Sequence, residues 1–434
     1  MKENRIQLSD HFSYGRLMRF AAAPIMMMVF TSIYGVVDGL FISNFVGKIP
    51  FAAINLIMPF IMVLSGMGFM VGTGGSALVA KTLGEGNRED ADRYFSMLVV
   101  FTVILGASMT AIGLFAMEPI ARLLGATDEM LPDCVAYGNV VMAFTTAFML
   151  QNLFQTILST AEKPKLGLFY TVAAGVTNMV LDALFVALFQ WGVVGAALAT
   201  GISQCVGGVL PLIYFLRPNT SLLRVRKTGL EFKIILKACS NGASEFMSNI
   251  SGSIVAMLYN FQLLKYAGAD GVAVYGVLMY VSFIFVAVFI GYTLASSPIV
   301  GFNHGSANHT ELKNILKKSV VLMICGGTIM MALSWALSGV LADVFVGYDQ
   351  GLRDMTQHAF VIFAFSFLLA GFNIFASSFF TALNNGAISA IISFLRSLVF
   401  QILAVLVLTL ILGLDGIWWS VAVADLFAIL ISVV

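Results

Sequence analysis

The stretch LGLFYTVAAGVTNMVLDALFVALF, residues 166–189, decides how the chain must fold. It is long enough to cross a bilayer as an α-helix, which takes about 20 apolar residues. It carries one charged residue, Asp182, with Asn178 one helical turn before it. A carboxylate at membrane depth costs roughly 2.5–3.5 kcal/mol on insertion scales, so it is rarely kept without a function. The stretch therefore indicates a transmembrane helix that holds an ion or proton site.

The composition extends this interpretation to the whole chain. Hydrophobic residues make up 59% of the 434 residues and charged residues only 10%, whereas soluble domains carry about 25% charged residues. A polytopic membrane protein is expected. The first apolar stretch follows Arg16 and Arg19 and continues to about Phe45, which is too long for the apolar core of a signal peptide. It is expected to stay in the mature protein as the first span.

The apolar stretches predict an all-α fold with twelve transmembrane helices. The expected spans are 17–45, 51–80, 94–117, 135–160, 165–190, 193–216, 235–264, 272–300, 318–342, 358–383, 388–412 and 417–434. Lys and Arg are divided 19 to 4 in favour of the side that holds the N-terminus. Because positive residues collect in cytoplasmic loops, both termini are expected in the cytoplasm and the protein in the plasma membrane.

A repeat divides the chain in two. The longest polar connector, Arg217 to Lys237, predicts an N-lobe of residues 1–216, a cytoplasmic linker of residues 217–237 and a C-lobe of residues 238–434. When GEGN at 84–87 is placed on GSAN at 305–308, NLF at 152–154 falls on NIF at 373–375 without a gap. We call this alignment of the two halves the repeat register. Six helices per copy return the chain to the same side, so a pseudo-twofold axis along the membrane normal is expected, with the binding cavity between or within the lobes.

Four polar residues of the N-lobe form the main candidate site. Asn178 and Asp182 are four residues apart, which puts both side chains on one helix face. Asp38 is a second acid embedded in the first span, and Thr200 brings a hydroxyl from the sixth. Two neighbouring carboxylates in an apolar bundle favour holding a proton, whereas carboxylate, amide and hydroxyl oxygens together suit a hard cation such as Na⁺. The sequence leaves proton and sodium open.

The repeat supplies an internal control for this site. In the repeat register the four polar residues have apolar or aromatic counterparts, which are Tyr259 for Asp38, Val399 for Asn178, Leu403 for Asp182 and Val421 for Thr200. A residue that the scaffold requires would be expected in both copies. The polar set is therefore interpreted as functional and as confined to the N-lobe.

The C-lobe has two embedded acids of its own. Glu245 follows Lys237 by about two helical turns, so its carboxylate is expected either to reach the inner interface by snorkelling or to form a secondary site. Asp425 lies in the twelfth span, and Arg396 in the eleventh is its expected counter-ion.

The first span also carries candidates for contact with a substrate. Met27 and Tyr34 belong to a stripe of Met and aromatic residues, which is usually lipid-facing or core but also forms adaptable surfaces for organic cations. No HExxH, GxSxG or Walker motif occurs, and the four cysteines have no zinc or disulfide spacing. We therefore expect neither an enzyme nor a bound cofactor, and any transport must draw on an ion gradient.

Several motifs together resemble those of the multidrug and toxic compound extrusion (MATE) transporters, in particular the prokaryotic branch. They are GMGFMVGTGGSA at 66–77, LGEGN at 83–87, the NMVLD segment at 178–182 and GVVGAALAT at 192–200, and the similarity covers essentially the whole chain. The resemblance implies two six-helix lobes, alternating access, and export of cationic or amphipathic compounds in exchange for protons or sodium. It also assigns Asp38, Asn178, Asp182 and Thr200 to the N-lobe cation site.

The chain departs from the family pattern in the C-lobe. Other branches place a Glu deeper in the seventh helix and an Asp in the tenth, whereas here Glu245 comes earlier and the SSF stretch at 377–379 has no acid. Two alternative functions stay open. A flippase for lipid-linked precursors would favour a strongly cationic cavity, and a non-transporting membrane sensor would favour a domain outside the bilayer. The expected partners are small organic cations or amphiphiles and the bilayer, with no nucleic acid, and the expected state is a monomer.

Overall fold

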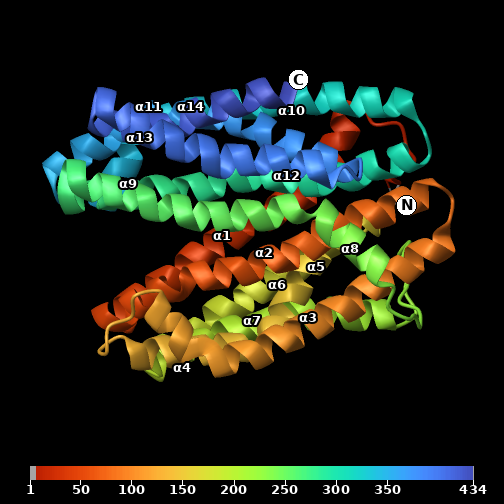
Figure 1. Cartoon of the computed structure of the whole chain (residues 1–434), viewed down its shortest axis with the longest axis horizontal. Coiled ribbons are helices and arrows are strands. Elements are labelled where there is room, and N and C mark those ends of the chain that lie inside the picture. Colours follow the sequence, from red (N-terminus) through yellow and green to blue (C-terminus); the bar gives the residue numbers. More distant parts are fainter. Residues whose placement is uncertain (1–5, 434) are drawn as a thin grey trace.

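The computed structural model describes residues 6–433, and within this range it contains helices and no strands. Figure 1 shows the helices lying side by side along one direction. In chain order they are α1 (Tyr14–Phe45), α2 (Lys48–Gly84), α3 (Arg88–Leu123), α4 (Leu131–Ala143), α5 (Thr145–Thr160), α6 (Pro164–Asp182), η1 (Ala183–Leu188), α7 (Gly192–Leu216), α8 (Phe232–Asn241), α9 (Ala243–Gly305), α10 (His309–Val346), α11 (Gln350–Ala382), α12 (Gly386–Phe394), η2 (Leu395–Val399), α13 (Phe400–Leu412) and α14 (Leu414–Val433).

The helices account for the twelve expected spans. In residues 6–433, ten helices are long and apolar enough to cross a membrane, and the bent pair α4 and α5 makes eleven. Helix α9 supplies one more, because its 63 residues would extend over about 95 Å, against about 30 Å of hydrocarbon. Its backbone leaves helical geometry at Gly268 (φ 63°, ψ −149°). Across this break Tyr259 stacks on Tyr275 with ring centroids 5.4 Å apart, so α9 is two antiparallel spans.

The fourth span is bent, which the apolar pattern of residues 135–160 did not indicate. Helices α4 and α5 meet at Phe144 with an angle of 56°. No proline lies at the break. The break is stabilised by neighbouring helices: the Thr110 hydroxyl donates to the Met142 carbonyl (2.8 Å), and the Phe144 ring fills the space that a Cβ on Gly201 would occupy. A carbonyl released by a bend in a membrane helix needs such a partner.

Two further spans, expected as continuous helices over 165–190 and 388–412, contain π-helical turns. These are η1, directly after Asp182, and η2, which contains Arg396. A π turn inserts one extra residue and changes which side chains face the bundle, and such turns occur often at functional sites. Each of these turns is associated with a charged residue inside the membrane region.

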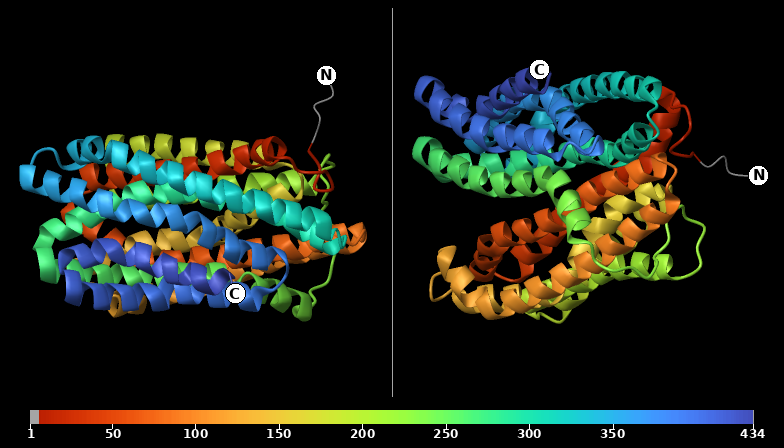
Figure 2. Two further views of the ribbon diagram at one scale, coloured as in Figure 1. Left: turned by 90° about the horizontal axis from the view of Figure 1, so that it is seen from above. Right: turned by 45° about the vertical axis from the view of Figure 1, so that its right-hand side comes forward.

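The helices form two groups, which we call the N-lobe (α1–α7) and the C-lobe (α9–α14). One core of the N-lobe is centred on Phe95, Phe154 and Phe215, and the main core of the C-lobe contains Tyr259 and Trp418. The right-hand view of Figure 2 shows the two groups in contact at the end where the described chain begins and spreading apart toward the opposite end. The division of the chain at residues 216 and 238 stays a prediction.

The lobes meet at the end of the molecule that carries the connectors 84–88, 161–164, 217–231, 305–309 and 383–386, which we call the basic end. A Cβ on Gly84 of α2 would lie 2.0 Å from the Phe302 carbonyl oxygen of α9, and a Cβ on Gly305 would lie 2.0 Å from that of Lys81. Only glycine permits these approaches. The repeat register converts Gly84 into Gly305 and Lys81 into Phe302, as expected for a pseudo-twofold axis between the two contacts.

The segment before α1 crosses the same junction. Leu8 and Phe12 are fully buried. The Leu8 amide donates to Glu162 Oε1 of the N-lobe (2.9 Å), and the Phe12 amide donates to Glu311 Oε1 of the C-lobe (2.9 Å). The Asn303 side chain of α9 donates to the Leu8 carbonyl at 3.4 Å. The lobes are thus held closed at the basic end.

Candidate functional site

Two helices of the N-lobe bring three polar side chains together, and Thr200 lies on a third helix that packs against one of them. Asp38 on α1 lies close enough to Asp182 and Asn178 on α6 to interact with both. Helix α6 packs against α1 on one side and against α7, which carries Thr200, on the other. Asp182 is 0% exposed and Asn178 is 1% exposed. We call these four residues the N-lobe cage.

Five of the six side-chain oxygen atoms of the cage are buried without a hydrogen-bond partner in the described chain. Asp182 Oδ1 and Oδ2, Asp38 Oδ1, Asn178 Oδ1 and Thr200 Oγ1 are buried and form no hydrogen bond with any residue of the range 6–433. Buried polar atoms nearly always have a partner, so each exception needs an explanation. A proton shared by the carboxylates, a small cation or ordered water supplies one.

The oxygen ligands of the cage suit a hard monovalent cation. No group of three or more His, Cys, Asp or Glu side chains comes together in the described part of the chain, so a cation here would rest on two carboxylates and neutral oxygens. Oxygen ligands of this kind match hard cations and not the transition metals that prefer thiolate or imidazole.

Two residues near the cage were missed by the sequence analysis. Gln204 lies one turn after Thr200 on α7, and its buried Oε1 has no partner among the described residues. Tyr137 on α4 is 2% exposed and lies near both carboxylates. The spacing of Thr200 and Gln204 is a signal that could have found the glutamine. Tyr137 carries no such signal, because the bend of α4 and α5 decides where it lies.

A second polar space lies between the lobes. This inter-lobe cavity has a volume of about 280 Å³. Its lining comes from α1, α2, α5, α9, α11, α12 and η2. Ser, Thr and Asn side chains dominate one part, and Met28, Phe69 and Ile290 contribute apolar surface. Glu245 is in the lining, as is Arg396.

Of the two expectations for Glu245, its position favours a secondary site over snorkelling to the inner interface. The chain breaks at Gly242, so Lys237 lies on α8 and Glu245 at the start of α9. A Cβ on Gly242 would lie 1.9 Å from the Met70 carbonyl oxygen, which holds this break against α2. Glu245 is half-buried and forms no ion pair with any described residue, Lys237 included. Its carboxylate faces the inter-lobe cavity instead.

The expected pairing of Arg396 with Asp425 is confirmed. Arg396 Nε lies 2.8 Å from Asp425 Oδ1. Asn373 Nδ2 donates to the same carboxylate oxygen at 3.3 Å and to the Asp425 carbonyl oxygen at 2.9 Å. Asp425 is thereby neutralised and is less suited than Asp182 to bind a coupling ion.

The two residues expected to line a cavity have different surroundings. Met27 is 1% exposed and packs with Ala287 and Leu294 of α9, and its neighbour Met28 lines the inter-lobe cavity. Tyr34 lies against α6, where a Cβ on Gly175 would come within 2.7 Å of its ring. It is also close to Asp38, so it belongs to the surroundings of the N-lobe cage.

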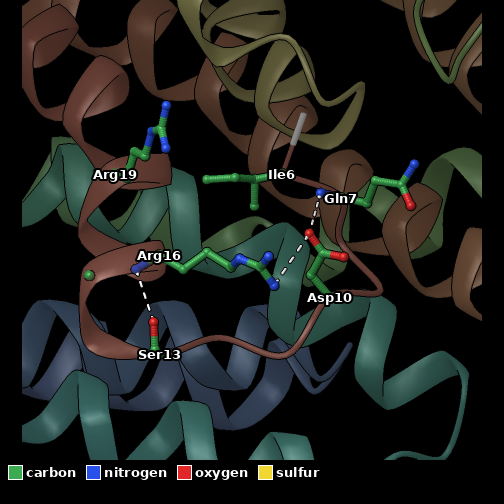
Figure 3. Close-up of a pocket in the computed structure, with 7 residues that line it drawn as sticks. Ile6, Gln7, Asp10, Ser13, Arg16 and Arg19 are labelled. Atoms are coloured by element: carbon green, nitrogen blue, oxygen red, sulfur yellow. Dashed lines mark hydrogen bonds and ion pairs between the residues drawn. The ribbon is translucent and has the colours of Figure 1, made fainter. Parts of the chain in front are cut away.

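A larger hollow of about 590 Å³ lies at the basic end, beside the segment before α1 (Figure 3). Its lining includes Asp10, Ser13, Arg16 and Arg19. Figure 3 shows Arg16 pointing toward Asp10, with which it forms an ion pair at 3.7 Å, and Ser13 accepts from the Arg16 amide. Asp10, Ser13 and Arg16 thus bond to one another or to nearby backbone, and Arg19 is exposed, as on an ordinary solvated surface. We therefore consider the N-lobe cage and the inter-lobe cavity as the candidate sites.

Comparison with known proteins agrees with this arrangement. The MatE family model matches residues 24–184 and again residues 246–407, and the repeat register places the start of the first match beside the start of the second. The "Multidrug export protein MepA" of Staphylococcus saprophyticus is 26% identical over 430 residues, covering 98% of this chain and 94% of that protein. The protein of the same name from Staphylococcus aureus strain MRSA252 is 23% identical over 434 residues, with the same coverage.

Solved structures show the same fold. One, described as the outward-facing conformation of a multidrug resistance MATE family transporter of the MOP superfamily, superimposes with a TM-score of 0.93 at 22% identity, covering 100% of this chain and 97% of that chain. A MOP superfamily transporter from Pyrococcus furiosus gives a TM-score of 0.91 at 21% identity, with the same coverage.

Proposed function

The chain belongs to the MatE family, and from this premise we propose that the protein is a secondary active transporter. It exports cationic or amphipathic small molecules in exchange for protons or sodium ions. The observation that carries the proposal is the N-lobe cage, where five buried oxygen atoms of four residues have no partner within residues 6–433. The names of the staphylococcal relatives support export as the direction.

The orientation follows from charge. The basic end faces the cytoplasm, because Lys and Arg collect on that side. The protein lies in the cell membrane with both termini in the cytoplasm and acts as a monomer. The lobes, held together at the basic end, alternate between opening outward and opening inward, as expected for repeats that rock against each other around a site between them.

Exchange requires that ion and substrate oppose each other. An antiporter needs a state in which binding of one ligand weakens binding of the other, and this coupling is reciprocal in free energy. Helix α1 is suited to transmit it, since Asp38 belongs to the cage and Met28 lines the inter-lobe cavity. A proton or sodium ion in the cage removes the repulsion between Asp38 and Asp182 and lets the outer part of α1 approach α6.

The outer part of α1 has room for this movement. A Cβ on Gly35 or Gly39, on either side of Asp38, would meet no atom within 4 Å. Pro24 interrupts the hydrogen bonding of the same helix nearer the basic end. Proline and glycine allow a membrane helix to bend. Binding in the cage thereby changes the shape of α1 and the space available to a substrate.

Efflux from proteoliposomes tests the proposal. Purified protein is reconstituted, loaded with a fluorescent organic cation, and energised separately with a pH gradient and with a sodium gradient. Wild type should export under at least one gradient, and Asp182→Asn should not. The matched control is Asp270→Asn, which alters an exposed aspartate next to the break in α9 and should leave efflux unchanged. Efflux by Asp182→Asn at the normal rate contradicts the proposal.

A further inference from the structure

The lining of the inter-lobe cavity contains one acidic and one basic side chain. Glu245 and Arg396 are the charged residues of its described lining. They come from different elements of the C-lobe, Glu245 from the start of α9 and Arg396 from the π turn η2. They do not form an ion pair with each other, since Arg396 bonds to Asp425. The cavity therefore keeps two opposite charges apart.

Both charges are available to a ligand. The Glu245 carboxylate has neither a hydrogen bond nor an ion pair with any residue of the range 6–433, and Asn249 donates to its backbone carbonyl only. Arg396 uses Nε for Asp425 and makes no other hydrogen bond in the same range, so its two terminal nitrogens are left for another acceptor. Its side chain is 22% exposed, toward a cavity that it lines.

Several neutral polar groups between the two charges satisfy one another. Ser377 Oγ lies 2.8 Å from Ser393 Oγ and 2.9 Å from Ser389 Oγ, and Ser389 Oγ lies 2.7 Å from Thr381 Oγ1. Thr381 in turn lies 3.4 Å from Ser244, the neighbour of Glu245. This chain of hydroxyls connects the two charged positions, and the lining residues Ser248, Ser297 and Ser378 make no side-chain hydrogen bond within residues 6–433. The two charges dominate the electrostatics of the cavity.

The scaffold does not require either charge. In the repeat register, Glu245 falls on Pro24 and Arg396 on Gly175, and both counterparts are uncharged. Asp425 falls on Gln204, so the buried ion pair has no copy in the N-lobe. An unpaired acid and a half-paired guanidinium beside a cavity are costly unless a ligand or water satisfies them.

We propose that Glu245 and Arg396 form a dipolar subsite that binds small zwitterions, the ammonium group at Glu245 and the carboxylate at the terminal nitrogens of Arg396. The apolar body of the ligand lies on Met28, Phe69 and Ile290. The volume of about 280 Å³ is at the lower limit of small-molecule sites, which span about 300–1,000 Å³. It suits a ligand of the size of an aromatic amino acid. The inference rests on the proposed function and assigns zwitterionic amphiphiles to its substrate class.

Three probes that share an indole ring and differ in their charged groups test the contribution of each charge. L-tryptophan carries both groups, tryptamine carries the ammonium alone, and 3-indolepropionate carries the carboxylate alone. Binding to the purified full chain is measured at pH 7 by equilibrium dialysis with labelled probes. Wild type should bind tryptophan about tenfold or more tighter than either relative, the effect of one partly desolvated charge pair. Glu245→Gln should lower the affinity for tryptophan to that for 3-indolepropionate.

Arg396 needs a variant that keeps Asp425 neutralised. Arg396→Lys retains the ion pair but removes the two terminal nitrogens of the guanidinium. The affinity for tryptophan should therefore fall to that for tryptamine, while the protein stays folded. Glu129→Gln and Arg88→Lys, exposed residues of the same types, should keep the wild-type order of affinities. The proposal is overturned if wild type binds tryptamine as tightly as tryptophan, if it binds none of the probes, or if both cavity variants keep the preference.

The test is separable from the proposed function. Asp182→Asn lies outside the cavity lining and should keep the preference for tryptophan while losing ion-driven efflux. One outcome is that the protein prefers tryptophan through Glu245 but transports under no ion gradient. This outcome would support the subsite and contradict antiport. Ion-driven efflux of tryptamine without any preference for the zwitterion would support antiport and contradict the subsite.

Discussion

The substitution Asp182→Asn is a sharp test of the N-lobe cage. It should stabilise or destabilise the protein relative to wild type according to whether the cage is empty, protonated or filled with sodium. The substitution conserves volume and removes a charge at a position that is 0% exposed and has no partner in the described chain. An ionised Asp at the centre of a membrane helix costs roughly 2.5–3.5 kcal/mol. The variant should gain stability of about this order when the wild-type carboxylate is ionised. The gain vanishes when the carboxylate holds a proton.

Sodium should act in the opposite sense. An ion that binds only the folded state stabilises it by RT ln(1 + [Na⁺]/Kd), about 2.7 kcal/mol at a concentration of 100 Kd. If the cage binds sodium, the ion should raise the unfolding temperature of wild type and leave that of Asp182→Asn unchanged. If it binds only a proton, wild type should lose stability relative to the variant as the pH rises, because deprotonation leaves a buried charge.

Thermal unfolding of the purified protein in detergent, over a matrix of pH and sodium concentration, measures both effects. Potassium at equal ionic strength is the control for screening, and Asp270→Asn is the control for loss of an exposed charge. An unfolding temperature that responds to sodium and pH in the same way in wild type and Asp182→Asn would refute the assignment of Asp182 to the site. So would a variant that unfolds several kcal/mol more easily, since no partner is lost.

Three further predictions follow from the geometry. Glu245→Gln should reduce ion-driven efflux less than Asp182→Asn does, and an equal or greater loss in the same proteoliposomes would move the coupling site to the C-lobe. Gly242→Ala should prevent the lobes from closing at the basic end, because its Cβ would lie 1.9 Å from a backbone oxygen of α2; spin-label distances between α2 and α9 that match wild type would contradict this. Arg396→Met should lower the free energy of unfolding by about 3–5 kcal/mol, because it leaves Asp425 buried and unpaired. The double variant with Asp425→Leu should recover most of this loss. A single variant as stable as wild type would show that the unpaired Asp425 is not destabilising.

The sequence predicted the number of spans and the proximity of Asn178 and Asp182. Twelve apolar stretches became twelve membrane crossings, since the length of a span is dictated by the bilayer. The i,i+4 spacing placed Asn178 and Asp182 on one face, and the structure brings Asp38 to both. These features depend on helix periodicity and on the cost of a buried charge, both of which act locally.

Breaks in the helices could not be predicted in this way. The bend at Phe144 has no proline and depends on Thr110 and Gly201 of other helices. The break at Gly242 puts Lys237 and Glu245 on different helices, whereas the sequence predicted one continuous span over 235–264. Tertiary contacts override local propensity at such positions. The polar groups of the inter-lobe cavity became recognisable as one site only when seven helical segments were placed together.

The most direct test of ion coupling is the affinity of the purified protein for a fluorescent organic cation as a function of pH and sodium, in wild type and in Asp38→Asn. Asp38 joins the cage to α1, so the two ligands should compete through it. In wild type the substrate affinity should fall as the cage is filled, and in Asp38→Asn this dependence should be lost or strongly reduced. A wild-type affinity that ignores both ions, or a variant that keeps the full dependence, would contradict the account.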